Sequence, residues 1–142
     1  MKRPASNTSL VELHVPDFKV VKHFYGELGY QVRWEEPAKG TEGYLVLQLE
    51  GNILAFWPGT ESVYGHAFFK QFPKETPRGY GVEIVTFVTN LDELYKRANK
   101  LESVVEELQT RPWGLKDFRI KDPHGYYLRF TEPDNILEAT NE

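Results

Sequence analysis

The sequence predicts an α+β fold, made of two tandem β-α-β-β-β modules whose strands form a concave, partly open mixed sheet. Three observations predict it. Several short segments alternate apolar and polar residues, as half-buried strands do. Two longer segments carry apolar residues at helical spacing. The order of these segments in the first half of the chain recurs in the second half, which indicates an internal repeat.

The first module begins with a strand at residues 9–15, where every second residue from Val11 is apolar. A helix follows at residues 18–28, and Asp17 is a capping residue in front of it. Gly29 ends the helix. Three more strands complete the module, and we place them at residues 30–35, 43–50 and 53–57. Residues 58–78 are irregular and long for a connection, which favours a linker or a lid.

The second module repeats this order. Asn90 is a possible cap of its helix. Its helix is predicted at residues 91–101. Its four strands are predicted at residues 81–88, 104–109, 118–121 and 126–132. In the last hairpin, pairing of like faces sets Ile120 opposite Leu128 and Phe118 opposite Phe130.

The repeat has an offset of 73 residues, which carries Val15 onto Val88 and Asp17 onto Asn90. The same offset carries the turn Gly51-Asn52 onto His124-Gly125. We therefore predict one domain over residues 1–142. Its modules span roughly residues 9–58 and 80–133, and residues 59–79 link them.

Composition excludes several classes of function. The 142 residues include no cysteine, which excludes disulfides, thiolate metal sites and cysteine nucleophiles. The net charge of −4 and the scattered basic residues argue against nucleic-acid binding. No apolar run is long enough to span a membrane, and no signal peptide is visible, so we expect a cytoplasmic protein. Aromatic residues make up 14% of the chain, which fits either a rich core or a ring-lined ligand site.

Alternation also divides the strand residues between two faces. The face away from the helices is mixed polar and aromatic, and no helix in the sequence is left to cover it. Such a face suits ligand binding or association with another copy of the chain. In the first half it carries Leu10, Glu12, His14, Tyr44, Val46, Gln48, Leu54 and Phe56, while Trp57 falls on the core face. In the second half it carries Glu83, Val85, Phe87, Arg119, Lys121, Tyr127 and Arg129.

The stretches "VPDFKVVKHFYGELGY" and "KDPHGYYLRF" resemble the vicinal oxygen chelate superfamily of glyoxalases, bleomycin resistance proteins and extradiol dioxygenases. The stretches "NLDELYKRA" and "RPWGLKDFRIKDPHG" are similar to segments of the bleomycin resistance proteins. The resemblance implies the paired-module fold. It further implies a homodimer that serves antibiotic resistance by sequestering its ligand in grooves between subunits, without catalysis. Trp113 is the implied groove residue.

Metal-using members of this superfamily place four ligands on the open face, two from each module. By the repeat, the corresponding positions are Leu10, Phe56, Glu83 and Arg129. Leu and Phe donate nothing, and a guanidinium is not deprotonated in proteins. We therefore predict no metal and no cofactor. Glu12 and His14 form a second possible metal pair, and polar residues on a strand face or at a dimer contact are the favoured interpretation of them.

The predicted function is metal-free binding of a small molecule, either bleomycin-like or another aromatic or cationic compound. The alternative is a metal-dependent lyase or dioxygenase of the same superfamily. Glu83 and Arg129 either pair with each other or each present a charge to the ligand. The predicted ligand-binding residues are Trp34, Phe56, Glu83, Phe87, Trp113, Tyr127 and Arg129.

Overall fold

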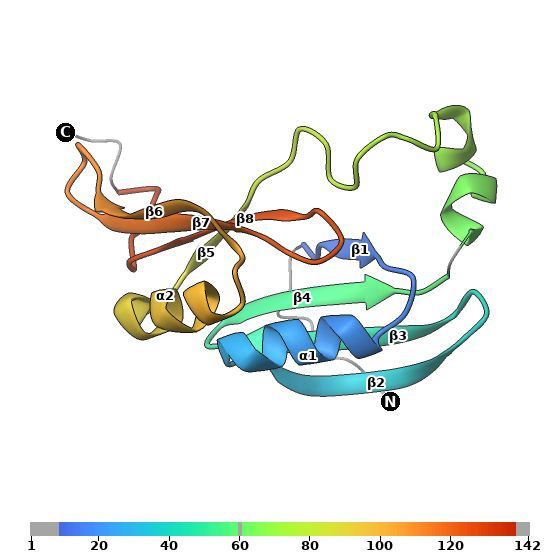
Figure 1. Cartoon of the computed structure of the whole chain (residues 1–142), viewed down its shortest axis with the longest axis horizontal. Helices are drawn as coiled ribbons and strands as arrows, with labels where there is room; N and C mark the ends of the chain where they lie inside the picture. Colours follow the sequence, from blue (N-terminus) through green and yellow to red (C-terminus); the bar gives the residue numbers. More distant parts are fainter. Residues whose placement is uncertain (1–8, 60, 139–142) are drawn as a thin grey trace. The chain divides into compact units, whose positions relative to one another are not determined.

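The computed structural model describes residues 9–59 and 61–138, and it confirms the order β-α-β-β-β twice along the chain (Figure 1). The elements of the first half are β1 (Glu12–His14), α1 (Lys19–Leu28), β2 (Gln31–Lys39), β3 (Glu42–Leu49) and β4 (Asn52–Trp57). Two short 3-10 helices follow, η1 (Ser62–Gly65) and η2 (Phe69–Gln71). The elements of the second half are β5 (Ile84–Phe87), α2 (Leu91–Lys100), β6 (Val104–Thr110), β7 (Lys116–Lys121) and β8 (Tyr127–Thr131).

The chain divides into two compact units. Unit 1 comprises Met1–Gly26 and Tyr30–Glu75, and unit 2 comprises Glu27–Gly29 and Thr76–Glu142. Each unit contains one four-stranded mixed sheet, with the strand order β1-β4-β3-β2 in unit 1 and β5-β8-β7-β6 in unit 2. In each sheet the first strand of the module runs parallel to the last, whereas the other neighbours are antiparallel.

In unit 1, helix α1 packs its apolar residues on one face of the sheet. The Asp17 carboxylate accepts a hydrogen bond of 2.9 Å from the Lys19 backbone N–H, so the predicted cap is present. Tyr25 is fully buried, and its ring centroid lies 5.6 Å from that of Phe56 and 5.2 Å from that of Tyr30. The core of this unit therefore lies between α1 and the sheet face that carries Phe56.

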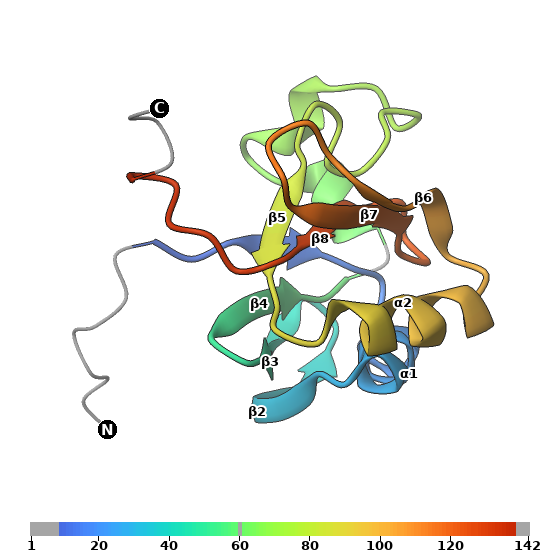
Figure 2. The same cartoon turned by 90° about the vertical axis from the view of Figure 1, so that its left-hand side faces the viewer.

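In unit 2, helix α2 packs on the face of the sheet that carries Phe118 and Phe130 (Figure 2). The Tyr95 ring meets the Phe118 ring edge-on at 5.0 Å between centroids. Asn90 precedes the helix as predicted, but its side chain makes no capping hydrogen bond. Acidic residues in the first turn and basic residues in the last turn complement the helix dipole.

Two segments contain more regular structure than predicted. The strand predicted at residues 30–35 continues as β2 to Lys39, and a tight turn at Gly40-Thr41 joins it to β3. The irregular segment at residues 58–78 contains η1 and η2. No helix among the described residues is long and apolar enough to cross a membrane.

Candidate functional site

The two hairpins differ in length by one residue, and this changes which face Phe56 occupies. Leu45 pairs with Phe56 in the first hairpin, whereas Phe118, which lies 73 residues after Leu45, pairs with Phe130, which lies 74 residues after Phe56. The offset of 73 therefore holds for the third strand of each module but not for the fourth. A one-residue slip moves every side chain to the other face of a sheet.

Phe56 is consequently a core residue, and its predicted place on the open face is wrong. Its side chain is fully buried beneath α1, beside Leu45. Ala55, rather than Phe56, stands at the position that corresponds to Arg129. The face predictions for Leu54 and Trp57 are wrong for the same reason, since Trp57 lies away from the core with its ring 4.6 Å from that of His14.

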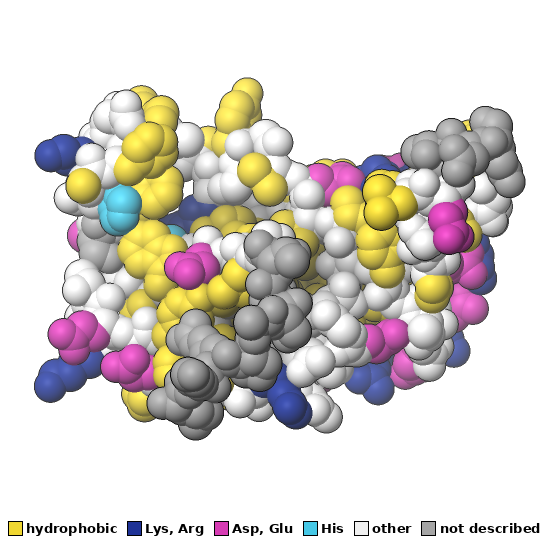
Figure 3. All heavy atoms as spheres, turned by 180° about the vertical axis from the view of Figure 1, so that it is seen from behind, with side chains coloured by type: hydrophobic (Ala, Val, Ile, Leu, Met, Phe, Trp, Pro, Cys, Tyr) yellow, Lys and Arg dark blue, Asp and Glu magenta, His cyan; other side chains and the backbone are white. Residues whose placement is uncertain are grey.

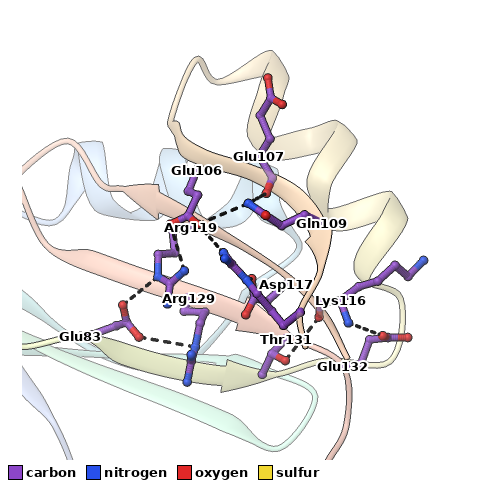
Figure 4. Close-up of polar contacts among 11 residues, drawn as sticks. Glu83, Glu106, Glu107, Gln109, Lys116, Asp117, Arg119, Arg129, Thr131 and Glu132 are labelled. Carbon is purple, nitrogen blue, oxygen red and sulfur yellow. Dashed lines mark hydrogen bonds and ion pairs between the residues drawn. The ribbon is translucent and has the colours of Figure 1, made fainter. Parts of the chain in front are cut away.

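On the open face of unit 2, Glu83 lies between two arginines (Figure 4). Arg119 and Arg129 face each other directly across β7 and β8. Arg119 Nε donates to Glu83 Oε2 at 2.9 Å, and Arg129 Nε lies 3.4 Å from Glu83 Oε1. The sequence left open whether Glu83 and Arg129 pair with each other or each present a charge to a ligand. The structure shows that they form an ion pair, and that Arg119 binds the same carboxylate.

These three residues are one end of a longer line of alternating charges. Arg119 Nη1 donates to Glu106 Oε2 at 3.0 Å, and Glu106 Oε1 accepts a further bond from Arg111. Arg111 Nε donates to Asp117 Oδ1 at 2.7 Å, and the Asp117 side chain is buried. We call this set the charged chain of unit 2, and its members in order are Asp117, Arg111, Glu106, Arg119, Glu83 and Arg129.

The pKa values of the middle members follow from these contacts. The hydrogen bond from Arg111 lowers the pKa of Glu106, burial opposes this shift, and the positive charge of Arg119 adds to it. The hydrogen bond to Glu106 raises the pKa of Arg111, and the bond to Asp117 acts in the same direction. Burial alone would lower the pKa of Arg119, but the hydrogen bond to Glu83 helps to raise it overall. Glu106, Arg111 and Arg119, in the middle of the charged chain of unit 2, are thus held in their ionised forms.

Phe87 and Tyr127 share the open face of unit 2 with Glu83 and Arg129, as predicted from alternation. Trp113 does not join them within the sheet. It lies in the turn before β7, whereas Tyr127 pairs with Lys121 at the other end of the same hairpin. Trp34 belongs to unit 1, on the edge strand β2, with its ring 5.7 Å from that of Tyr44.

The turn that carries Trp113 is closed by the backbone. Arg111 N–H donates to the Leu115 carbonyl at 2.8 Å, and Gly114 has a φ of 93°, a conformation that favours glycine. Trp113 is 60% exposed at the tip of this turn. Its position excludes a role as a core residue and leaves the ring available for contact with a ligand or with another protein surface.

Unit 1 contains a second cluster that the sequence did not predict. We call it the aromatic segment, and it comprises Trp57, His66, Phe68, Phe69 and Phe72. Consecutive rings lie 4.7 to 5.9 Å apart between centroids. His66 Nδ1 accepts hydrogen bonds from the backbone N–H groups of Phe68 and Phe69, which orients its ring. The three phenylalanines are 40 to 56% exposed, and Figure 3 shows hydrophobic side chains gathered beside a histidine in this region.

The arrangement does not fit a divalent metal. The described residues contain no group of three or more His, Cys, Asp or Glu side chains placed to hold a metal ion. Both oxygens of Glu83 already contact guanidinium groups, so a metal ion there would stand beside two positive charges. In the second candidate pair, His14 is buried and its Nε2 makes a hydrogen bond with the Gly59 carbonyl, while Glu12 is exposed.

The sequence contained a signal for the charged chain. The predicted pairs Ile120–Leu128 and Phe118–Phe130 place Arg119 opposite Arg129, and like charges directly opposite each other are destabilising. A carboxylate between them is the expected solution, and Glu83, on the strand predicted at residues 81–88, is the acidic residue that the structure places there. The aromatic segment had no comparable signal, because its members follow neither strand nor helix periodicity.

Solved structures with this fold include TioX from Micromonospora sp. ML1, with a TM-score of 0.65 and 22% identity over 91% of this chain and 98% of that one. They also include a bleomycin-binding protein complexed with bleomycin, with a TM-score of 0.60 and 18% identity over 91% and 100% of the two chains. A bleomycin resistance determinant encoded on the transposon Tn5 aligns with a TM-score of 0.63 and 17% identity over 92% and 100%. No curated protein matches the chain.

These likenesses to solved structures concern the fold. The family model goes further, because it matches residues 9–130 and so includes both modules and the charged chain. With the two β-α-β-β-β modules in place, the chain belongs to the glyoxalase/bleomycin resistance protein/dioxygenase superfamily.

Proposed function

We propose that this protein is a cytoplasmic, metal-free binding protein of the bleomycin-resistance type, which captures a small aromatic molecule and leaves it chemically unchanged. One observation carries the proposal. Glu83 is the one carboxylate among the four positions that correspond to metal ligands in relatives, and it is held between Arg119 and Arg129. Ala55, which takes the place of Phe56 among these four positions, has no side-chain atom that could bind a metal either.

Exposed aromatic side chains supply the binding part of the proposal. Trp113 is 60% exposed and Trp34 is 46% exposed, and the aromatic segment adds three exposed phenylalanines. Each ring that stacks on a flat ligand contributes roughly 0.5–1.5 kcal/mol beyond the burial of its area. Several such contacts are needed for micromolar affinity, which corresponds to about 8 kcal/mol. Bleomycin itself, or another aromatic compound, is the ligand we propose.

We further propose that the protein acts as a homodimer. Trp113, at the tip of a turn, and Trp34, on an edge strand, are both exposed, and this exposure supports the proposed contact with a neighbouring chain. Static light scattering after gel filtration tests this. The expected mass is twice the 16.5 kDa of one chain, and a single-chain mass at micromolar protein would contradict the dimer.

The test of binding is a titration with metal-free and with copper-loaded bleomycin, followed by tryptophan fluorescence. All three tryptophans of the chain report on the titration. We expect saturable quenching at micromolar ligand and recovery of unchanged bleomycin after denaturation of the protein. Absence of quenching would remove bleomycin as the ligand, and a chemically altered product would contradict sequestration.

A further inference from the structure

The charged chain of unit 2 ends in a guanidinium group that is only partly used. Arg129 contacts Glu83 through Nε at 3.4 Å, and its side chain is 25% exposed. Within the part of the chain that the structure describes, Nη1 and Nη2 of Arg129 make no hydrogen bond. A guanidinium group has five N–H donors, so most of the donors of Arg129 are available.

Glu83 does not neutralise Arg129 on its own. The same carboxylate makes the shorter contact with Arg119, at 2.9 Å against 3.4 Å. The opposite end of the charged chain is a buried carboxylate, Asp117. The charges therefore alternate from a negative group inside the unit to a positive group at the open face. Figure 4 shows the end of the Arg129 side chain extending past its contact with Glu83.

Two more donors share this face. Tyr127 precedes Arg129 by two residues on β8 and pairs with Lys121 on β7, so all three side chains project from the same side of the sheet. Lys121 is exposed, and neither Lys121 nor the Tyr127 hydroxyl makes a hydrogen bond with any described residue. An ammonium group and a phenol O–H are donors, and the nearby acceptor, Glu83, is already occupied.

From this donor-rich arrangement we infer that the ligand carries an anionic oxygen group, such as a carboxylate, phosphate or sulfonate, and that Arg129 binds it through its terminal nitrogens. The inference rests on the proposed function and, of its two candidate ligands, favours another aromatic compound over bleomycin, which is cationic. Planar anionic groups match the fork of an arginine, and such charge-assisted bonds are about twice as strong as neutral ones. A cationic ligand, the sequence-based expectation, would face two guanidinium groups here.

A purely structural role for Arg129 does not account for the geometry. The contact of Glu83 with Arg119 satisfies one carboxylate oxygen, and the Arg129 Nε is buried without a hydrogen bond of normal geometry. A guanidinium group that is partly desolvated and only weakly bonded destabilises the protein. An anionic ligand would supply acceptors to the terminal nitrogens of Arg129 and so compensate its weak bonding to Glu83.

The experiment uses two fluorescent probes with the same aromatic skeleton. One is 8-anilinonaphthalene-1-sulfonate, which is anionic, and the other is N-phenyl-1-naphthylamine, which lacks the sulfonate. We expect Arg129→Gln to weaken binding of the anionic probe about tenfold and to leave binding of the neutral probe unchanged. Arg129→Lys, which keeps the charge and loses the fork, should give a smaller loss for the anionic probe alone.

Arg97→Gln is the matched control, because it removes one exposed arginine from helix α2 of the same unit. It should change the affinity for neither probe. The inference is overturned if Arg129→Gln weakens both probes equally or neither of them, while the proposed function stands as long as the neutral probe binds. If the parent protein does not bind the anionic probe, the inference fails, whereas the proposed function is decided separately by the bleomycin titration. Circular dichroism verifies that each variant is folded. If Arg129→Gln does not fold, the comparison of the two probes with Arg129→Lys decides the outcome.

Discussion

Arg119 and Arg129 are direct cross-strand partners in the β7–β8 hairpin, and both bind the single carboxylate of Glu83. Two guanidinium groups in this position repel each other unless an anion lies between them. Glu83 supplies that anion from the position directly before β5, the strand that lies beside β8 in the sheet. The three residues thus link β7 and β8 to the position before β5 on the open face of unit 2.

The first prediction concerns Glu83→Gln, which leaves the two arginines facing each other without a charge between them. We expect the free energy of unfolding to fall by about 1–3 kcal/mol, because a partly buried ionic hydrogen-bond acceptor is lost. Urea unfolding followed by circular dichroism measures it. The same substitution in an Arg129→Gln background should be less harmful, since one of the two repelling charges is gone. Strictly additive effects would show that the residues are not coupled.

The fold was predictable because its signals are local. Alternation located the strands, and helical spacing located α1 and α2 to within one residue at each end. The turn predicted at His124-Gly125 is present, and the Asp122 carboxylate beside it accepts hydrogen bonds from the backbone N–H groups of His124 and Tyr126. Signals of this kind depend on neighbouring residues alone, so one sequence is sufficient to read them.

The register of the first hairpin was not predicted, because the repeat was assumed to have equal turns. Leu49 pairs with Asn52 across two turn residues, whereas Asp122 and Tyr126, the corresponding pair, enclose three. The error moved Phe56 onto the wrong face. Matching the apolar residues Leu45 and Phe56 across the strands, as was done for Phe118 and Phe130, would have corrected it.

The second prediction concerns Trp113, whose ring is 60% exposed at the tip of a turn. Trp113→Ala should weaken the binding of bleomycin, the ligand used in the titration. It should change the free energy of unfolding by less than about 0.5 kcal/mol, because exposed side chains contribute little to stability. Calorimetric titration and thermal unfolding measure the two quantities. Tyr80→Ala removes an 81% exposed ring from the same unit and is the control. Equal affinity of the Trp113 variant and the parent would exclude Trp113 from the site.

The third prediction concerns metals. Protein purified without chelators should contain well below one equivalent of Zn, Ni, Fe or Mn, since Glu83 is paired and its partner positions are Leu10, Ala55 and Arg129. Elemental analysis by mass spectrometry measures this directly. One equivalent of any of these metals would favour the lyase or dioxygenase alternative. Loss of that metal in Glu83→Gln would then locate it on this face.

The fourth prediction concerns stability in acid and rests on Glu106. Its bonds with Arg111 and Arg119 lower its pKa in the folded protein below the ordinary value. A carboxyl group with a lowered folded pKa stabilises the protein above its unfolded pKa, and this stabilisation is lost as the pH falls through the folded value. The loss should therefore begin near the ordinary pKa of glutamate, about 4.3, and continue below it.

Glu106→Gln should remove this component. The variant is expected to be less stable than the parent at pH 7 and to show a flatter decline in stability below about pH 4.3. Glu107→Gln is the matched control, because Glu107 is the exposed neighbour and forms no ion pair with the described residues. Urea unfolding at a series of pH values from neutral to acidic measures the slopes. Parallel curves for Glu106→Gln and the parent would mean that Glu106 titrates alike in the folded and unfolded states, and that its contacts with Arg111 and Arg119 do not persist in solution.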